Sequence, residues 1–210
     1  MLEFYIVLRY NFCMNIFKLE PNLGGDECNT YIVENGDSTV IIDCGAKLED
    51  VKKYITKKVA CILLSHGHFD HIYELENYIN EFNCPVYGGE GVVEKLADSK
   101  CNLSASFSEK LVVFGEDVVK FVKEIREQLL NIGGFDIECI TLKGHSECGM
   151  GYVIEGNLFC GDTLFCNCVG RYDLYDSSFS ALRNSLKKIN KLEGIVACFP
   201  GHGEDFELNN

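Results

Sequence analysis

The chain has 210 residues, 47% of them hydrophobic, which fits a single domain over 1–210 with a sizeable core. Its formal net charge of -13 argues against nucleic acid and anionic membranes as partners, because both are negatively charged. The amino-terminal apolar runs are too short to span a bilayer and lack a secretory cleavage site, so we expect a cytoplasmic protein.

The predicted elements begin at Met14, where a strand starts; residues 1–13 are either an N-terminal extension or contain an additional edge strand. Residues 28–34 and 38–43 are β-branched runs joined by an Asn-Gly-Asp turn at 35–37, which predicts a hairpin. The next elements are a short helix at 48–55, a buried strand at 59–64, a helix with Ile72, Leu75, Ile79 and Phe82 at helical spacing, and a short strand at 85–87 ended by Gly88-Gly89.

Residues 91–132 have the least regular pattern. A helical face is formed by Val118, Phe121, Val122, Ile125, Leu129 and Ile132. The same stretch is compatible with two strands joined near 124–128. We favour a helix at its centre.

The second half repeats the order of strands, helix and strand. Its predicted elements are strands at 135–142, 151–155 and 158–160 with a tight turn at Gly156-Asn157, a helix carrying Phe179, Leu182, Leu186, Ile189 and Leu192, and a last strand at 195–199. Sheets with helices outside them form a layered sandwich, so we expect an α/β fold.

The 12 cysteines have irregular spacing and no CxxC motif. In a reducing compartment most of them are expected to be small buried hydrophobic residues. We interpret Cys148, Cys166 and Cys168 as packing residues, because nothing near them in the sequence indicates a lowered thiol pKa.

The most informative stretch is His66-Gly67-His68-Phe69-Asp70-His71, directly after the strand ending at Leu64. Three imidazoles and one carboxylate so close together are costly unless a cation holds them. Neutral imidazole nitrogen and carboxylate oxygen are ligands for zinc, iron or manganese. Gly67 permits a sharp turn, so that His66 and His68 point to one centre while Asp70 and His71 point to another.

Three further candidate ligands, His145, Asp162 and His202, each follow a predicted strand and lie beside glycine. Taken alone, each is as well explained by an ordinary turn. Together with the cluster they account for all 5 histidines of the chain, which indicates a shared site.

The ordered motifs HGHFDH, GHS, GDT and PGHG resemble those of the metallo-β-lactamase superfamily, particularly its small glyoxalase II-like hydrolases. The resemblance extends from about Met14 to the carboxyl terminus. It implies a four-layer αββα sandwich. It also implies one metal site at His66, His68 and His145, a second at Asp70, His71 and His202, a bridging Asp162, and an orienting role for Asp43.

Two departures limit what the resemblance implies about substrate. Ser146-Glu147 stands where the family often has Thr-Pro, and the chain ends eight residues after His202, without the helical domain that helps glyoxalase II hold glutathione. Specificity for glutathione thioesters is therefore not implied. Asp162, where antibiotic-degrading β-lactamases generally have a cysteine, argues against that activity.

We expect two divalent metal ions, zinc first and iron or manganese as alternatives, to hold a shared hydroxide that attacks the carbonyl of a small-molecule substrate. Asp70 is the expected catalytic residue, orienting this nucleophile and accepting its proton. A thiolate leaves readily because thiol pKa is near 8.5, whereas an amide nitrogen needs an acid. No Glu or Tyr is identifiable as a dedicated acid, so thioester or activated ester hydrolysis is favoured, with Tyr172 or Tyr175 as the residues that could reach the site and supply one.

Alternatives of the same fold stay open. An iron-dependent persulfide dioxygenase would use one iron held by His66, His68 or His145, and Asp162. A nuclease is disfavoured by the acidic charge, and an electron-transfer module by the lack of a flavin-binding domain. Arg171 is a candidate substrate clamp, although an ion pair with Asp173 is the favoured interpretation, and Asn102 and Ser104 are weaker candidates for the pocket.

Overall fold

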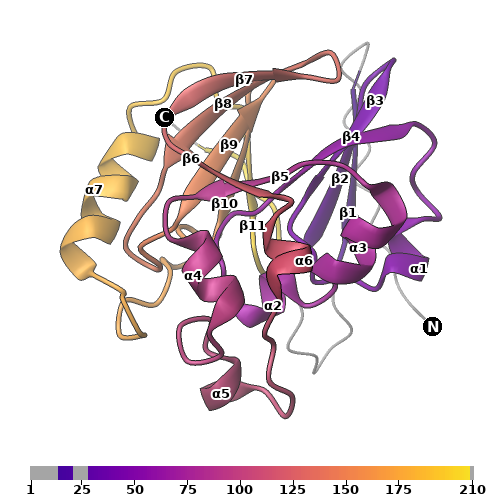
Figure 1. The fold of residues 1–210 in the computed structure, drawn as a ribbon. Helices are drawn as coiled ribbons and strands as arrows, with labels where there is room; N and C mark the ends of the chain where they lie inside the picture. The colour runs from indigo at the N-terminus through magenta and orange to yellow at the C-terminus, as the bar shows by residue number, and fades with distance from the viewer. Residues whose placement is uncertain (1–13, 21–27, 209–210) are drawn as a thin grey trace.

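The structure is a computed structural model in which residues 14–20 and 28–208 are described. The alternatives for residues 1–13 lie outside the described residues. Two β-sheets face each other, with helices on their outer faces (Figure 1). This is the αββα arrangement that the resemblance implies, and it confirms the layered sandwich expected from the order of strands and helices.

The first sheet has six strands in the order of the chain. It begins with antiparallel pairs and continues with parallel ones, because helices connect its later strands. Its strands are β1 (Asn15–Leu19), β2 (Thr30–Glu34), β3 (Ser38–Ile42), β4 (Lys58–Leu63), β5 (Val86–Gly89) and β6 (Val122–Ile125). The predicted hairpin is confirmed: Asn35 Oδ1 accepts hydrogen bonds from the backbone N–H groups of Asp37 and Ser38 in the β2–β3 turn.

The second sheet has five strands in the order β11-β10-β9-β8-β7. They are β7 (Gln128–Ile132), β8 (Phe135–Thr141), β9 (Met150–Ile154), β10 (Asn157–Gly161) and β11 (Ala197–Pro200). Because β9 is antiparallel to both β8 and β10, and β11 is parallel to β10, the strands β8, β10 and β11 all end at the same edge.

Three apolar clusters account for the four layers. The cluster between the sheets includes Tyr31, Tyr152, Phe159 and Phe199, and a second packs the outer face of the first sheet against α3. The third packs the second sheet against Ile189 of α7. The helices are α1 (Leu48–Val51), α2 (Phe69–Ile72), α3 (Leu75–Phe82), α4 (Val92–Ala97), α5 (Ser104–Phe107), α6 (Glu116–Val119) and α7 (Phe179–Ile189).

The helix expected at the centre of residues 91–132 is wrong. After α6, residues 122–125 form β6 beside β5, and residues 128–132 form β7 beside β8, so the alternative of two strands is correct. The apolar residues of this stretch fit helical spacing by coincidence. Its two strands belong to different sheets and are only partly buried, so their apolar residues do not alternate regularly. Leu129, on the supposed apolar face, is in fact exposed.

Smaller differences have local causes. The helix expected after the histidine cluster is divided into α2 and α3. Gly88 and Gly89 belong to β5 rather than ending it, and a Cβ at Gly89 would lie 2.2 Å from the Cys148 carbonyl oxygen, so the close approach requires glycine there. The turn before β10 is formed by Glu155 and Gly156, both with positive φ, instead of by Gly156-Asn157.

The eleven cysteines in the described part of the chain are free thiols, and nine of them are buried. Cys148 packs in the interior as expected. Cys166 and Cys168 are exposed, so their interpretation as packing residues is wrong: they lie at the tip of a hairpin closed by the Leu164–Val169 bridge. Among the described residues, none of the helices is long and apolar enough to cross a membrane.

Candidate metal centre

The seven predicted ligands come from segments that follow four strand ends at one edge of the sandwich. His66 and His68 follow β4, and Asp70 and His71 lie on α2 immediately afterwards. His145, Asp162 and His202 follow β8, β10 and β11. Since those three strands end together, side chains up to 136 residues apart in sequence, from His66 to His202, converge.

One group consists of His66, His68 and His145. The Nε2 atoms of His66 and His145 each lie 3.0 Å from Nδ1 of His68, and all three rings are buried. The ligand atoms therefore meet at one point, where a metal ion would replace the contacts between them.

A second group consists of Asp70, His71 and His202. Asp70 Oδ2 lies 3.0 Å from His202 Nε2 and 3.6 Å from His71 Nε2. His71 is fully buried, whereas the His202 side chain is 38% exposed. The site therefore opens to solvent on the side of His202.

Asp162 lies between the two groups. Its Oδ2 is 3.4 Å from His145 Nε2 and 3.6 Å from His202 Nε2, and its Oδ1 is 3.4 Å from His71 Nε2. One carboxylate thus faces imidazoles of both groups.

The neighbours of the rings fix the direction of their free nitrogens. His71 Nδ1 donates to Asp43 Oδ2 at 2.8 Å, and His145 Nδ1 donates to the Arg171 carbonyl oxygen at 2.9 Å. Ser65 Oγ donates to Asp43 Oδ2 and so accepts from His66 Nδ1 at 3.1 Å. In each ring the Nε2 lone pair then points into the site, as in metal-binding histidines held by a hydrogen bond at the other nitrogen.

The residues fit a pair of metal ions on the grounds of this structure alone. His71 Nε2 and Asp162 Oδ1 are buried, face each other and have no hydrogen-bond partner. Buried polar atoms are nearly always paired, so two orphaned acceptors aimed at one space indicate a missing cationic partner. A set of imidazoles and carboxylates suits zinc, iron or manganese.

Histidine pKa values are shifted in different directions in the two groups. Burial and the charges of neighbouring imidazoles hold the pKa values of His66 and His68 well below the usual range, which favours the neutral, ligating form. Burial acts in the same direction on His71, but Cys28 and the Asp70 carboxylate outweigh it and raise the His71 pKa. Burial alone would raise the pKa of Asp162; His71 and His202 outweigh it and lower that pKa.

Two glycines permit the close approach of these segments. A Cβ at Gly201 would lie 2.1 Å from Asp162 Oδ1, and one at Gly170 would lie 1.8 Å from the Asp162 carbonyl oxygen. Glycine at these positions therefore leaves room for Asp162 between the two groups.

Other sequence candidates have mostly structural contacts. Arg171 forms the expected ion pair with Asp173, at 2.9 Å. Asn102 is buried and bonds the carbonyl groups of Lys95 and Val112, and Ser104 Oγ accepts from Val112 N. Tyr172 packs on Phe179, and Tyr175 lies under Lys95. Sequence reasoning missed Ser65 and Lys95; a buried serine or lysine beside the motif has no spacing signal.

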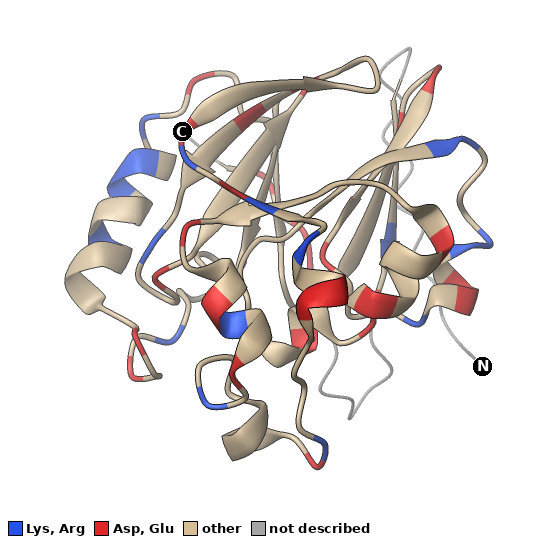
Figure 2. Ribbon diagram, viewed as in Figure 1, with Lys and Arg blue, Asp and Glu red and all other residues tan. Residues whose placement is uncertain are grey.

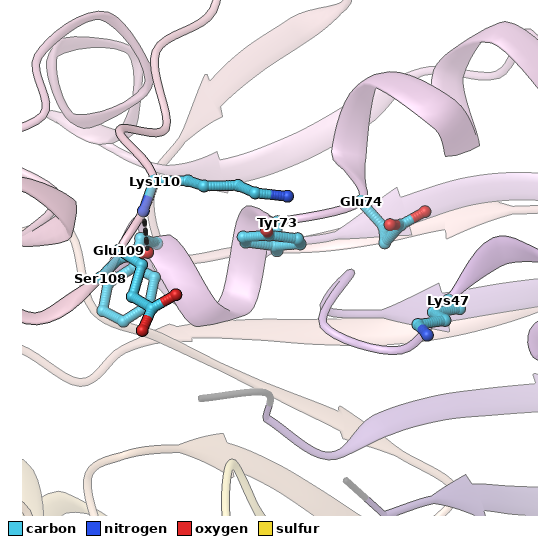
Figure 3. Close-up of a pocket in the computed structure, with 7 residues that line it drawn as sticks. Lys47, Tyr73, Glu74, Ser108, Glu109 and Lys110 are labelled. Carbon is cyan, nitrogen blue, oxygen red and sulfur yellow. Dashed lines mark hydrogen bonds between the residues drawn. The ribbon is translucent and has the colours of Figure 1, made fainter. Parts of the chain in front are cut away.

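A cavity of about 480 Å³ lies beside α2 (Figure 3). Tyr73, which follows α2, projects into it from three residues after Asp70, a spacing that puts the two side chains on the same side of a helix. The cavity is lined by Lys47, Phe69, Tyr73, Glu74, Ser108, Glu109 and Lys110. Figure 2 shows acidic residues on α2, α3 and α6, with basic residues on α7.

The chain is similar in sequence to a known family and to several of its members. A family model described as metallo-beta-lactamase superfamily matches residues 23–202. A probable metallo-hydrolase of Methanocaldococcus jannaschii is 31% identical over 199 residues, covering 89% of this chain and 92% of that protein. A probable metallo-hydrolase of Streptococcus pyogenes is 28% identical over 207 residues, covering 94% and 88%. A hydroxyacylglutathione hydrolase of Idiomarina loihiensis is 28% identical over 169 residues, covering 79% and 56%.

Solved structures are also similar to this chain. The BLEG-1 B3 metallo-beta-lactamase superposes with a TM-score of 0.81 at 26% identity, covering 91% of this chain and 93% of that one. TTHA1623 in a di-iron-bound form has a TM-score of 0.74 at 27% identity, covering 90% and 94%.

Proposed function

The chain belongs to the metallo-beta-lactamase superfamily, and on that premise we propose that it hydrolyses a thioester or related ester at two divalent metal ions. One site consists of His66, His68 and His145, and the other of Asp70, His71 and His202. The observation that carries the proposal is the position of Asp162, which faces imidazoles of both groups at 3.4–3.6 Å. A carboxylate in that position suits a bridge between two metal ions.

The chain's own residues have distinct roles in this proposal. Two divalent cations would supply Lewis acidity and a hydroxide nucleophile near neutral pH. Asp70 Oδ2 is on the open side of the site, 3.0 Å from His202 Nε2, and accepts the proton of the attacking water. Asp43 and Ser65 keep the imidazoles of His71 and His66 oriented.

The expected leaving group of the substrate follows from the side chains that could protonate it. An amine must be protonated as it leaves, whereas a thiol with a pKa near 8.5 departs as thiolate. Tyr172 and Tyr175, the only acids that the sequence suggested, have their own contacts with Phe179 and Lys95. The similarity to a hydroxyacylglutathione hydrolase, named for a thioester substrate, supports the same choice.

The cavity beside α2 is our proposed position for the part of the substrate that does not react. Its volume of about 480 Å³ is within the range of small-molecule sites. Tyr73 offers an aromatic face there, and the lining carries both signs of charge, with two lysines and two glutamates.

A second candidate activity is cleavage of a lactam, which the similarity to the BLEG-1 B3 metallo-beta-lactamase favours despite the expectation from Asp162. The metal is the other open choice. The likeness to TTHA1623 in its di-iron-bound form supports iron as a candidate beside zinc.

Purification without chelators, elemental analysis, and anaerobic assays on a thioester, a lactone, a β-lactam and a phosphodiester test the proposal. We expect two metal ions per chain and fastest turnover of the thioester without oxygen. One iron per chain, with oxygen uptake on a persulfide and no anaerobic hydrolysis, would establish the dioxygenase instead. Fastest turnover of the β-lactam would make the chain a lactamase.

A further inference from the structure

Lys95 is a buried cation beside the candidate metal centre. It lies on α4, is 2% exposed, and its Nζ is 2.6 Å from Asp176 Oδ2 and 3.1 Å from the Cys101 carbonyl oxygen. The ammonium also sits over the Tyr175 ring, 5.4 Å from its centroid. The Lys95 ammonium is costly to desolvate, and its partner Asp176 is itself partly exposed, so the pair is a weak contributor to stability and invites another explanation.

The stem of Lys95 supports the turn that carries His66 and His68. A Cβ at Gly67, between these two histidines, would lie 2.7 Å from Lys95 Cβ. The turn therefore rests directly on the lysine side chain, and the position of that side chain sets the position of the turn.

Asp176 reaches the turn that carries His145. Its Oδ1 accepts a hydrogen bond from the backbone N–H of Glu147, two residues after His145, at 3.3 Å. Asp176 has φ of 55°, a left-handed conformation that is uncommon for residues other than glycine. The ion pair thus connects both turns of the three-histidine group.

The backbone of Lys95 adds a third connection. The Lys95 carbonyl oxygen accepts from Asn102 Nδ2 at 2.9 Å, and the Asn102 carbonyl oxygen accepts from Phe69 N at 2.9 Å. Phe69 is the first residue of α2 and follows His68. These contacts keep Lys95 and the histidine cluster in a fixed relation.

We propose that Lys95 and Asp176 are positioning residues that hold the turns of His66, His68 and His145 in register for one metal ion. This inference rests on the proposed function, because it takes these histidines as ligands. It adds that the ion pair selectively controls the metal of the three-histidine group, since the side chains of Lys95 and Asp176 contact the turns at Gly67 and Glu147.

A purely electrostatic role predicts a different pattern. Near a bound cation, removal of the Lys95 charge would leave the Asp176 carboxylate unopposed and strengthen metal binding. Removal of the Asp176 charge would leave the ammonium unopposed and weaken it. A positioning role predicts that both substitutions weaken binding, because each breaks the ion pair that joins the two turns.

The experiment compares Lys95→Met, which keeps the stem against Gly67, with Asp176→Asn, which keeps the left-handed backbone and an acceptor for Glu147. Zinc-loaded proteins are mixed with excess chelator well below their unfolding temperatures, and release of each metal ion is followed. Lys52→Met is the matched control, because Lys52 forms an exposed ion pair with Glu81 on the helical layer.

We expect both variants to release one of the two zinc ions about 10–100-fold faster than the wild type, with the other unchanged, and Lys52→Met to behave as wild type. Faster release of both ions equally, slower release from Lys95→Met, or no change in either variant would overturn the proposal. If Lys95→Met does not fold, the double variant Lys95→Met/Asp176→Asn decides: positioning predicts faster release, and charge alone predicts none. Failure of the wild type to bind metal would refute the proposed function itself.

Discussion

Asp43 Oδ2 lies 2.8 Å from Nδ1 of His71, and this contact sets the direction in which the His71 ring points. The same carboxylate accepts from Ser65 N and Ser65 Oγ, both at 2.7 Å. Asp43 reaches this position because it has φ of 60° directly after β3, where the strand breaks. The end of one strand thereby orients a histidine that follows the next.

The first prediction concerns this carboxylate. Asp43→Asn keeps the shape and tolerates the left-handed backbone, but its amide replaces an acceptor facing His71 and Ser65 with a donor. We expect metal affinity to fall about 10–100-fold, as is typical for groups that orient metal-binding histidines. Chelator competition measures this. Asp37→Asn, in the exposed β2–β3 turn, is the control; an equal effect of both substitutions would contradict the assignment.

The second prediction concerns the cavity beside α2. Tyr73→Ala removes the aromatic face, whose contact is worth about 1 kcal/mol, so we expect KM for the hydrolysed substrate to rise about fivefold with kcat nearly unchanged. Steady-state kinetics measure the two parameters separately. Leu129→Ala, an exposed apolar residue on β7, should leave both unchanged. A fall in kcat with constant KM would place Tyr73 in the chemistry instead.

The third prediction is a pattern of thiol reactivity. Burial raises the pKa of Cys28 to about 12 and those of Cys84 and Cys139 to about 11, whereas Cys166 and Cys168 are exposed. Since the thiolate is the reactive form, iodoacetamide at pH 8 should modify Cys166 and Cys168 first among the described cysteines. Mass spectrometry of peptides locates the label. Rapid labelling of Cys28 in the native protein would contradict this order, and in the unfolded chain all cysteines should react.

The fourth prediction is the order in which acid removes the metal ions. A histidine must be neutral to bind a metal, so a higher pKa means stronger competition from protons at a given pH. Burial would lower the His202 pKa, but Asp162 and Asp70 outweigh it and raise it, as the His71 pKa is raised. As pH falls through histidine's ordinary range, the ion at Asp70, His71 and His202 should therefore leave first. His66 and His68 remain neutral at lower pH.

Metal content after equilibration at stepped pH values gives this order, and His202→Ala identifies which step belongs to which group. Release of both ions in a single step, or earlier loss from the three-histidine group, would show that the difference in pKa does not govern binding.

Much of the fold was predictable because its strands carry local signals. The β2–β3 hairpin has its turn residues, and β4 is a continuous apolar run before the histidine cluster. The strands β6 and β7, between which the chain passes from the first sheet to the second, were not predictable in the same way. Their residues are amphipathic at a spacing that fits a helix, and only pairing with β5 and β8, distant in sequence, makes them strands.

The candidate ligands were predictable from composition and motif order, since all five histidines follow predicted strands. The residues that position these ligands were not predictable. Lys95 lies in a helix without any motif, and Asp176 in an irregular loop, and their relation to Gly67 and Glu147 arises only when four distant segments fold together. Likewise, no sequence pattern indicated that Cys166 and Cys168 are exposed.

The measurement that tests the central claim most directly is the metal content of wild type and His202→Ala, purified without chelators and assayed on the same thioester. The wild type should hold two metal ions, and His202→Ala one, with hydrolysis reduced about 100-fold or more because the second ion is lost. If His202→Ala retains the metal content and the hydrolysis of the wild type, the two-metal account of this site is contradicted.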